Sequence, residues 1–292
     1  MMTQRIHLVG EKNKEPTRLF LKLDINLPIT FTTFKGKQAM DLQLKGKRAI
    51  LAGASKGIGR AVAETLAAEG CTIELCARDQ VGVDDAVQQL RGQGAAVTGE
   101  SVDLGDASAY RNWVARASER LGGCDIFVCF GSAGGGAPSE ERWQAAFELD
   151  LLATYRGIEA ALPALEKSGH AAVIVISTTV AIEPAFGPQP YAALKAAVTN
   201  YAGALAHSLA PKGIRVNTVS PGPILIEGGA WDKIKSGRRE FYDKTVAQVP
   251  LGRLGAAKEI ADAVAFLASP LSAFTTGTNM VIDGGMTKRV QH

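Results

Sequence analysis

Two residues in the run "PYAALKAAV" (190–198) have side chains that together can move a proton. Tyr191 and Lys195 are four positions apart, and positions i and i+4 lie on the same face of a helix. A free phenol gives up its proton only near pH ~10. An ammonium group about 5 Å away, at an effective dielectric constant of about 20, stabilises a phenolate by about 3 kcal/mol. The pair is therefore expected to exchange a proton near neutral pH.

A glycine-rich stretch, "AGASKGIGR" (52–60), lies between the first predicted strand and the first predicted helix. Its glycines permit a tight turn and a close approach of the backbone to a ligand. The N-terminus of the helix beyond supplies free N–H groups and a partial positive charge. These features favour the pyrophosphate of a dinucleotide over the alternative, a plain strand–helix turn. The residues expected to bind it are Gly53, Ser55, Lys56, Gly57, Ile58 and Gly59.

The stretch "CARD" (76–79), after the second predicted strand, bears on which dinucleotide is bound. An acidic residue there would bind the hydroxyl groups of the adenosine ribose and repel a phosphate. This chain has Arg78 there and Lys56 in the glycine-rich stretch, and two cations favour NADP(H) over NAD(H). Asp79, one residue later, argues for NAD(H). The alternative role for both cations is that of solvated surface charges.

Seven apolar, strand-like runs alternate with helical patterns from Leu44 onward. Strands that are apolar on both faces and separated by helices form a parallel sheet that helices cover on both faces. The predicted fold class is therefore α/β, a single doubly wound Rossmann-type domain with a seven-stranded parallel sheet, whose ligands bind beyond the carboxyl ends of the strands. The runs are "RAILAG" (48–53), "TIELCA" (72–77), "AAVTGESVD" (95–103), "DIFVCF" (125–130), "AAVIVIS" (171–177), "IRVNTVS" (214–220) and "NMVID" (279–283).

Residues 40–292 are assigned to this domain, whereas residues 1–39 do not join the alternation. The first 39 residues are interpreted as an upstream or vector-derived leader. The alternative is an added hairpin, because "RLFLKLDI" (18–25) alternates like a half-buried strand. The same residues carry seven Lys and Arg against three Asp and Glu, so the rest of the chain is close to neutral.

The composition excludes several classes of partner. A formal net charge of +3 is too small to favour nucleic acid or an anionic membrane. No apolar run approaches the ~18 residues of a membrane span, and the first residues lack the apolar core of a secretory signal, so the cytoplasm is predicted. The four cysteines, at 71, 76, 124 and 129, lie in or beside apolar runs. Small core residues are favoured there over a disulfide, and no metal site is predicted.

Five motifs occur in the order and spacing of one enzyme family. With them the chain resembles the short-chain dehydrogenase/reductase family from residue 44 to about residue 287, and is 3-oxoacyl-carrier-protein-reductase-like. The resemblance implies an NADP(H)-dependent oxidoreductase that transfers a hydride between nicotinamide and a small-molecule carbonyl or secondary alcohol. The motifs are "GASKGIG" (53–59), "VDL" (102–104), "YAALK" (191–195), "IRVNTVSPGPI" (214–224) and "VIDGG" (281–285).

The resemblance also implies roles for individual residues. Tyr191 would donate the proton. Lys195 would lower the pKa of the Tyr191 phenol and bind the nicotinamide ribose. Thr178 stands where the family usually has serine and would polarise the substrate carbonyl. Ser177 would point to the opposite side of the strand. Further cofactor contacts are implied for Asp103 and Leu104 at the adenine and for Pro221, Gly222 and Ile224 at the nicotinamide.

The chain departs from the family pattern at three places. Asp150 in "FELDLLATY" (147–155) aligns with the asparagine that supports a proton-relay water, and an ionised carboxylate cannot donate a hydrogen bond. The relay would then run through backbone and water, or Asp150 would titrate with the site. After the fourth predicted strand, the family's usual Asn-Asn-Ala-Gly is replaced by "CFGSAGGG" (129–136). Its small residues leave room for the cofactor, which Gly131 is expected to contact, but the side-chain amide contacts are lost. Ala52 replaces the threonine that usually precedes the first glycine.

Residues 225–250 lie where the family places its mobile substrate lid. An apolar wall is expected from Trp231, Phe241 and Tyr242. Four basic residues would attract an anionic tail such as that of an acyl carrier, or would form the solvated face of a helix. They are Lys233, Lys235, Arg238 and Arg239.

A non-catalytic NADP(H)-binding sensor or scaffold on the same fold is the alternative to an enzyme, since a fold does not settle function. The presence of Tyr191, Lys195 and Thr178 favours the enzyme. Asp150 and the altered loop at 129–136 favour the sensor.

The helix "YAALKAAVTNYAGALAHSLA" (191–210) carries small apolar residues on more faces than one site requires. Burial against the sheet alone is one explanation. The family resemblance implies pairing with the same helix of another subunit. A homo-oligomer, a tetramer or a dimer, is therefore expected.

Overall fold

The computed structural model describes residues 40–290 of the chain. The predictions for residues 1–39, a leader or a hairpin that includes the run 18–25, lie outside the described residues.

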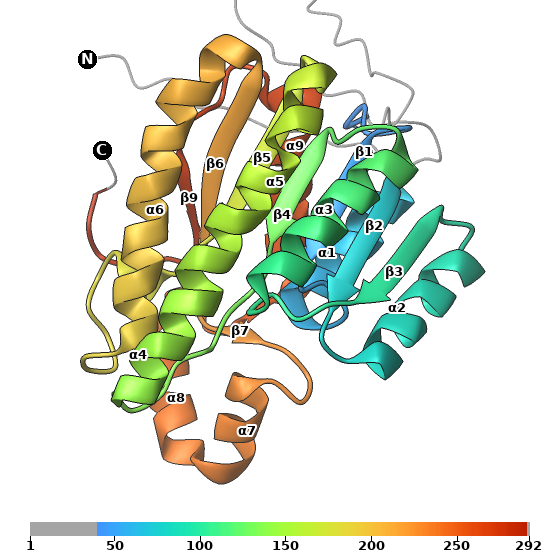
Figure 1. Cartoon of the computed structure of the whole chain (residues 1–292). Coiled ribbons are helices and arrows are strands. Elements are labelled where there is room, and N and C mark those ends of the chain that lie inside the picture. The colour runs from blue at the N-terminus through green and yellow to red at the C-terminus, as the bar shows by residue number, and fades with distance from the viewer. Residues whose placement is uncertain (1–39, 291–292) are drawn as a thin grey trace, which may run out of the picture. The chain divides into compact units, whose positions relative to one another are not determined.

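A seven-stranded sheet forms the centre of the molecule, with the strand order β3-β2-β1-β4-β5-β6-β9 (Figure 1). Every neighbouring pair in it is parallel. The order reverses between β1 and β4, as in a doubly wound fold, so the predicted fold class and the seven predicted strands are confirmed. The strands are β1 (Arg48–Ala52), β2 (Thr72–Ala77), β3 (Val97–Ser101), β4 (Ile126–Cys129), β5 (Ala171–Ile176), β6 (Ile214–Pro221) and β9 (Asn279–Ile282).

Helices cover both faces of this sheet and enclose two hydrophobic clusters. Because successive strand residues point to opposite faces, Ala49 and Leu51 of β1 join one cluster and Ile50 and Ala52 the other. One face packs against α1 (Gly57–Ala68), α2 (Gln80–Gly92) and α9 (Ala257–Ala268). The other packs against α3 (Ala107–Leu121), α5 (Ala153–Ser168) and α6 (Pro190–Leu209), which are in front in Figure 1.

The long helical pattern near residues 140–167 is not one continuous helix. A π-helical turn at Phe147–Leu152 separates α4 (Glu140–Ala146) from α5. A π turn accommodates an extra residue and re-aims the side chains around it, and such turns are frequent at functional sites. Here the turn packs against α6 and leaves Asp150 with no exposed surface.

After β6 the chain leaves the sheet at its carboxyl edge. It forms β7 (Ile224–Leu225), α7 (Ala230–Gly237) and α8 (Arg239–Gln248), and then β8 (Gly255–Ala256), which pairs with β7. In Figure 1 α7 and α8 lie beyond the carboxyl ends of the strands. This is the segment in which the sequence predicts a substrate lid.

Three 3-10 turns, Thr179–Ala181, Ala210–Lys212 and Pro270–Ser272, complete the regular structure of the described residues. Within residues 40–290, none of the helices combines the length and the apolar character that crossing a membrane requires.

The four cysteines are buried and unpaired, as expected for small core residues. Burial raises the pKa of the Cys71 thiol to about 12. The same cause raises the pKa of the Cys124 thiol to about 12. Both thiols are therefore protonated at neutral pH.

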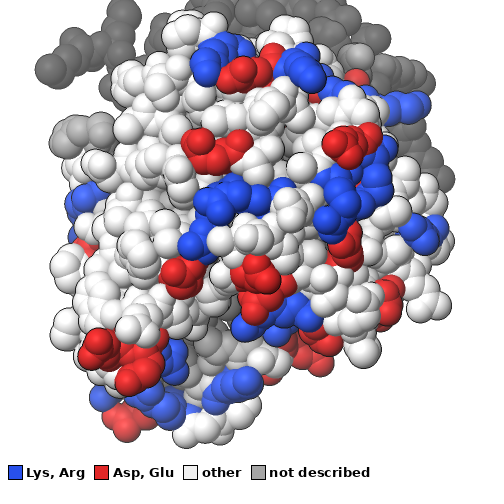
Figure 2. All heavy atoms as spheres, viewed as in Figure 1, with Lys and Arg blue, Asp and Glu red and all other residues white. Residues whose placement is uncertain are grey.

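Basic and acidic side chains are interspersed on the face of the molecule that Figure 2 shows. Among the described residues, ion pairs include Arg120 Nη2 with Oε2 of the buried Glu74 at 2.7 Å and Lys212 Nζ with Glu166 Oε1 at 2.7 Å. This face therefore carries no extended field of one sign.

Candidate functional site

Loops that follow several strands meet at the carboxyl edge of the sheet, next to α7 and α8 (Figure 1). A cavity of about 1290 Å³ opens there. Its lining comes from the loop after β4, the segment between β5 and α6, the residues after β6, α7 and α8, and the C-terminal residues 286–288. This is the edge at which ligands bind to doubly wound sheets.

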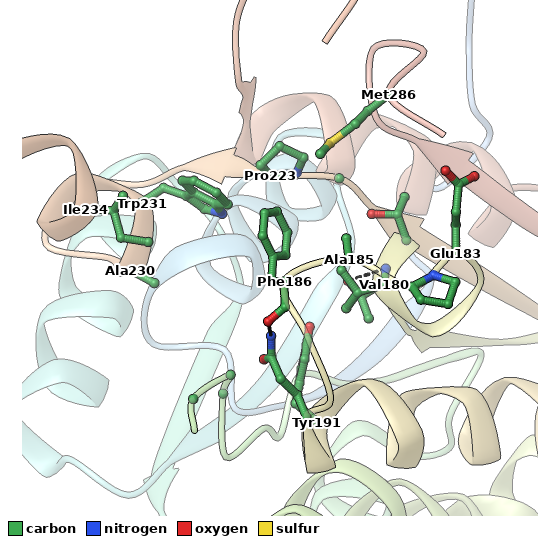
Figure 3. Close-up of a pocket in the computed structure, with 18 of the residues that line it drawn as sticks. Val180, Glu183, Ala185, Phe186, Tyr191, Pro223, Ala230, Trp231, Ile234 and Met286 are labelled. Atoms are coloured by element: carbon green, nitrogen blue, oxygen red, sulfur yellow. Dashed lines mark hydrogen bonds between the residues drawn. The ribbon is translucent and has the colours of Figure 1, made fainter. Parts of the chain in front are cut away.

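Tyr191 and Lys195 occupy the first two turns of α6, which begins at Pro190. Proline is favoured at this helix position because its missing N–H would have no helical partner and its fixed φ suits the helix. Lys195 Nζ lies 6.0 Å from the centre of the Tyr191 ring, so the two side chains lie on one helix face. Tyr191 lines the cavity (Figure 3), whereas Lys195 is only 3% exposed.

The Lys195 ammonium group has two partners in the interior. Its Nζ donates a hydrogen bond to the Ile176 carbonyl oxygen at 2.9 Å and lies 3.3 Å from Asp150 Oδ1. The second oxygen of Asp150 accepts a hydrogen bond from the Ala133 N–H at 3.1 Å. The π turn thus places a carboxylate beside the lysine, and the two form a buried ion pair.

Thr178 lies two residues after the end of β5 and lines the cavity together with Tyr191. Within residues 40–290, its hydroxyl oxygen accepts one long hydrogen bond, 3.4 Å, from the Val180 N–H, and the hydroxyl hydrogen has no acceptor. The hydroxyl of Ser177 instead lies 2.6 Å from that of Thr199 and donates to the Lys195 carbonyl at 3.2 Å. Ser177 therefore faces α6, on the opposite side of the strand from Thr178.

The glycine-rich stretch has the geometry of a turn that leads into a helix. Gly53 and Gly57 have φ values of +81° and +62°, which residues with side chains rarely adopt. A Cβ on Gly59 would lie 2.8 Å from Ala54 Cα and from the Gly53 carbonyl oxygen, so the helix packs too closely for any other residue. Lys56, the N-cap of α1, makes no side-chain capping hydrogen bond, which leaves the helix N-terminus open to an anion.

Two cations flank this stretch. Lys56 and Arg78, which follows β2, are both exposed, and neither forms an ion pair with a described residue. Asp79 lies next to them: its Oδ2 and the Ser55 hydroxyl are 3.0 Å and 3.5 Å from the point that a Cβ on Gly82 would occupy. Two cations and one carboxylate therefore lie beside the glycine-rich stretch.

The residues predicted to contact the two ends of a dinucleotide lie on neighbouring loops. Leu104 Cδ1 is 2.9 Å from where a Cβ on Gly131 would be, so the loops after β3 and β4 touch. Asp103 Oδ1 accepts a hydrogen bond from the Gly105 N–H at 2.9 Å. Pro221 at the end of β6 and Ile224 at the start of β7 are buried, and Gly222 donates its N–H to the Ile282 carbonyl at 2.9 Å.

The apolar wall of the cavity differs from the predicted one. Trp231 and Phe241 line the cavity, but Tyr242 does not, and Phe186 from the loop before α6 joins them. Of the four basic residues only Arg238 lines the cavity. Phe241 and Tyr242 are adjacent on one helix, about 100° apart, so only one of them can face the cavity.

A model of the family described as enoyl-(acyl carrier protein) reductase matches residues 53–287 of the chain. The chain is 35% identical to isoepoxydon dehydrogenase patN of Penicillium expansum over 247 residues, which cover 83% of the chain and 95% of that protein. It is also 35% identical to the 3-oxoacyl-[acyl-carrier-protein] reductase FabG of Escherichia coli (strain K12) over 251 residues, 84% of the chain and 99% of that protein.

The chain belongs to the short-chain dehydrogenase/reductase family. Among solved short-chain dehydrogenase/reductase structures, L-sorbose reductase from Gluconobacter frateurii, complexed with NADPH and L-sorbose, is similar to it. The TM-score is 0.79 at 28% identity, and the match covers 86% of this chain and 100% of that one.

For this short-chain dehydrogenase/reductase, the sequence interpretation missed Phe186 and the contact of Asp150 with Lys195. The run "EPAFGPQP" (183–190) contains a signal for the first, because an aromatic residue between prolines directly before Tyr191 is held close to the site. The second had no sequence signal, since the residues are 45 positions apart and meet only through the π turn.

Proposed function

We propose that the protein is an NADP(H)-dependent oxidoreductase that transfers a hydride between nicotinamide and a carbonyl or secondary alcohol. The observation that carries this proposal is that the hydroxyl-bearing residues Thr178 and Tyr191 line one cavity, with Lys195 on the same helix face as Tyr191. The names of the relatives, a 3-oxoacyl reductase, an isoepoxydon dehydrogenase and an L-sorbose reductase, support it.

The residues present fit a dinucleotide. The uncapped N-terminus of α1 and the close packing at Gly59 suit a pyrophosphate, with Gly53, Ser55 and Ile58 around it. Lys56 and Arg78 would hold the phosphate of the adenosine ribose. When bound, the nicotinamide supplies or accepts the hydride. The remaining proposed contacts are Asp103 and Leu104 at the adenine and Gly131, Pro221, Gly222 and Ile224 at the nicotinamide.

The side chains of the cavity perform the acid–base part of this mechanism. Thr178 donates a hydrogen bond to the substrate oxygen and stabilises the negative charge that develops on it. Tyr191 gives that oxygen a proton in the reduction and takes it back in the oxidation. Lys195 stabilises the phenolate that remains. Asp150 is proposed as a positioning residue that holds the Lys195 ammonium group by the 3.3 Å contact.

A non-catalytic sensor on the same fold is the second candidate. The observation that favours it is the ion pair of Lys195 with Asp150, because a carboxylate so close to the ammonium group offsets part of the positive charge that acts on Tyr191.

The test measures NADPH oxidation with a panel of ketones, aldehydes and acyl thioesters. Tyr191→Phe is expected to lower turnover by about 100- to 10,000-fold, because general acid catalysis is lost. The control is Tyr155→Phe, a tyrosine on α5 that is 39% exposed and outside the cavity lining, which is expected to retain activity. Tight NADPH binding without turnover in the wild-type protein would favour the sensor.

A further inference from the structure

Phe186 is held in an unusual backbone conformation at the mouth of the cavity. Its φ is +63°, in the left-handed region that residues other than glycine rarely adopt. Such a conformation costs free energy and persists where the surrounding structure enforces it, often at ligand sites. The Phe186 carbonyl accepts a hydrogen bond from Gln189 Nε2 at 3.2 Å, and the Phe186 ring packs against two other rings, which supports this conformation. A large apolar side chain that is 42% exposed is thereby presented to the cavity.

The Phe186 ring completes a three-ring wall, which we define as Phe186, Trp231 on α7 and Phe241 on α8. Trp231 and Phe241 are stacked, with planes 5° apart and centres 6.0 Å apart. Phe186 lies edge-on to both, with its ring centre 5.9 Å from that of Trp231 and 5.7 Å from that of Phe241. Figure 3 shows Phe186 and Trp231 beside each other, above the Tyr191 side chain.

The rest of the lining includes small and apolar residues. Gly134, Gly135 and Gly136 line the cavity without side chains, and Pro223 and Met286 add apolar surface. The lining also carries polar side chains, and among them the hydroxyl groups of Thr178 and Tyr191 are suited to bind a substrate oxygen.

Several cations of the lid have partners within the lid itself. The Arg238 guanidinium lies over the Phe241 ring, 4.6 Å from its centre. Arg239 is paired with Asp243 at 2.9 Å, and Lys244 with Glu240 at 2.7 Å. These contacts weaken the case for a charged carrier tail across the lid.

We propose, on the basis of the function proposed above, that the substrate is a cyclic ketone or cyclic alcohol whose ring lies against the three-ring wall. A rigid, flat ring gains the full stacking contact and has little conformational freedom to lose. A flexible linear chain loses rotational freedom and matches the rings poorly. Phe186 is then the specificity-determining residue, because it joins the loop beside Tyr191 to the two rings of the lid.

The experiment compares kcat/KM with NADPH for a two-ring ketone (1-tetralone), a linear ketone (2-octanone) and a linear acetoacetyl thioester. The wild-type protein is expected to prefer the two-ring ketone. Phe186→Ala should lower kcat/KM for that substrate by about 10- to 100-fold and for the linear substrates by less than about threefold. Phe186→Leu restores volume without a ring, so it should recover only part of the loss. Phe274→Ala, a fully exposed phenylalanine outside the cavity lining, is the control.

A binding measurement separates failure of this inference from failure of the proposed function. Calorimetric titration of the protein–NADP⁺ complex with the two-ring ketone should show binding that Phe186→Ala weakens, whether or not turnover occurs. If the two-ring ketone binds without turnover, the inference about the three-ring wall stands and the proposed catalytic function is refuted. A wild-type preference for linear substrates, or an equal loss on all substrates in Phe186→Ala, overturns the inference.

Discussion

Asp150 Oδ1 lies 3.3 Å from Lys195 Nζ, and the two side chains are 0% and 3% exposed. Removing a charge pair from water is costly, and mutual attraction and further hydrogen bonds offset that cost only when both partners are present. Here the carboxylate also accepts the Ala133 N–H, and the ammonium group donates to the Ile176 carbonyl. The pair is therefore sensitive to loss of either member.

Asp150→Ala is expected to lower the free energy of unfolding by about 3–5 kcal/mol, because it leaves an uncompensated buried ammonium group. Asp150→Asn should cost less, since the amide retains one of the two contacts. Urea unfolding measures both. Glu240→Ala, at an exposed ion pair, is the control and should change stability by less than about 0.5 kcal/mol. Wild-type stability in Asp150→Ala would show that the pair does not form in solution.

Arg78→Ala and Lys56→Ala are each expected to raise the Kd for NADPH by about 10- to 100-fold, as for the loss of a charged hydrogen bond. The Kd for NADH should stay nearly constant, because NADH lacks the phosphate on the adenosine ribose. Fluorescence titration with both nucleotides measures this difference. Lys258→Ala, on the exposed side of α9, serves as the matched control. Equal weakening of both nucleotides would show that these cations do not recognise the phosphate.

Asp125 makes stability depend on pH in the acid range. Burial alone raises the pKa of Asp125, but hydrogen bonds from Arg48 and Ser168 outweigh it and lower the pKa from 3.8 to about 2. A depressed carboxyl pKa contributes stability above the unfolded value and loses it as the pH falls through the folded value. Asp125→Asn should therefore cost about 1–2 kcal/mol at pH 7 and progressively less between about pH 4 and pH 2.

Denaturant unfolding at a series of pH values measures the Asp125 contribution. Asp84→Asn, an exposed carboxylate on α2, is the control and should leave the pH dependence unchanged. A difference between wild type and Asp125→Asn that stays constant down to pH 2 would contradict the assignment.

We expect the chain to form a homo-oligomer through the outer face of α5 and α6. Tyr155 is 39% exposed on that face, and its ring lies edge-on to that of Tyr201, 6.0 Å between centres. Light scattering should give a multiple of the chain mass of 30.7 kDa. Tyr155→Glu should shift the protein toward a monomer, whereas Val81→Glu on α2, which covers the opposite face of the sheet, should not. A wild-type monomer at micromolar concentration would refute this expectation.

The sequence predicts the sheet well because its inner strands, such as β4 and β5, are buried on both faces and therefore read as uninterrupted apolar runs. Tyr191, Lys195 and the glycine-rich stretch are likewise predictable, since each depends on spacing within one local element. Position 59 requires glycine because the start of α1 packs so closely against Gly53 and Ala54 that a Cβ would clash.

Other features depend on tertiary geometry that no local pattern encodes. The π turn that brings Asp150 to Lys195 looks like ordinary helix in sequence. The choice of Phe241 over Tyr242 depends on where α8 begins, and Gly237 at the end of α7 does not by itself fix that start at Arg239. The left-handed conformation of Phe186 lies outside what residue propensities predict.

The segment 225–250, for which the sequence predicts a substrate lid, begins in contact with the glycine-rich stretch. Ile226, one residue after β7 and four before α7, has its Cδ1 3.6 Å from the point that a Cβ on Gly57 would occupy. A dinucleotide bound at that stretch is therefore expected to contact the first residues of the predicted lid as well. We expect a compulsory-order kinetic mechanism, in which the dinucleotide binds first and dissociates last. Product inhibition patterns measure this order.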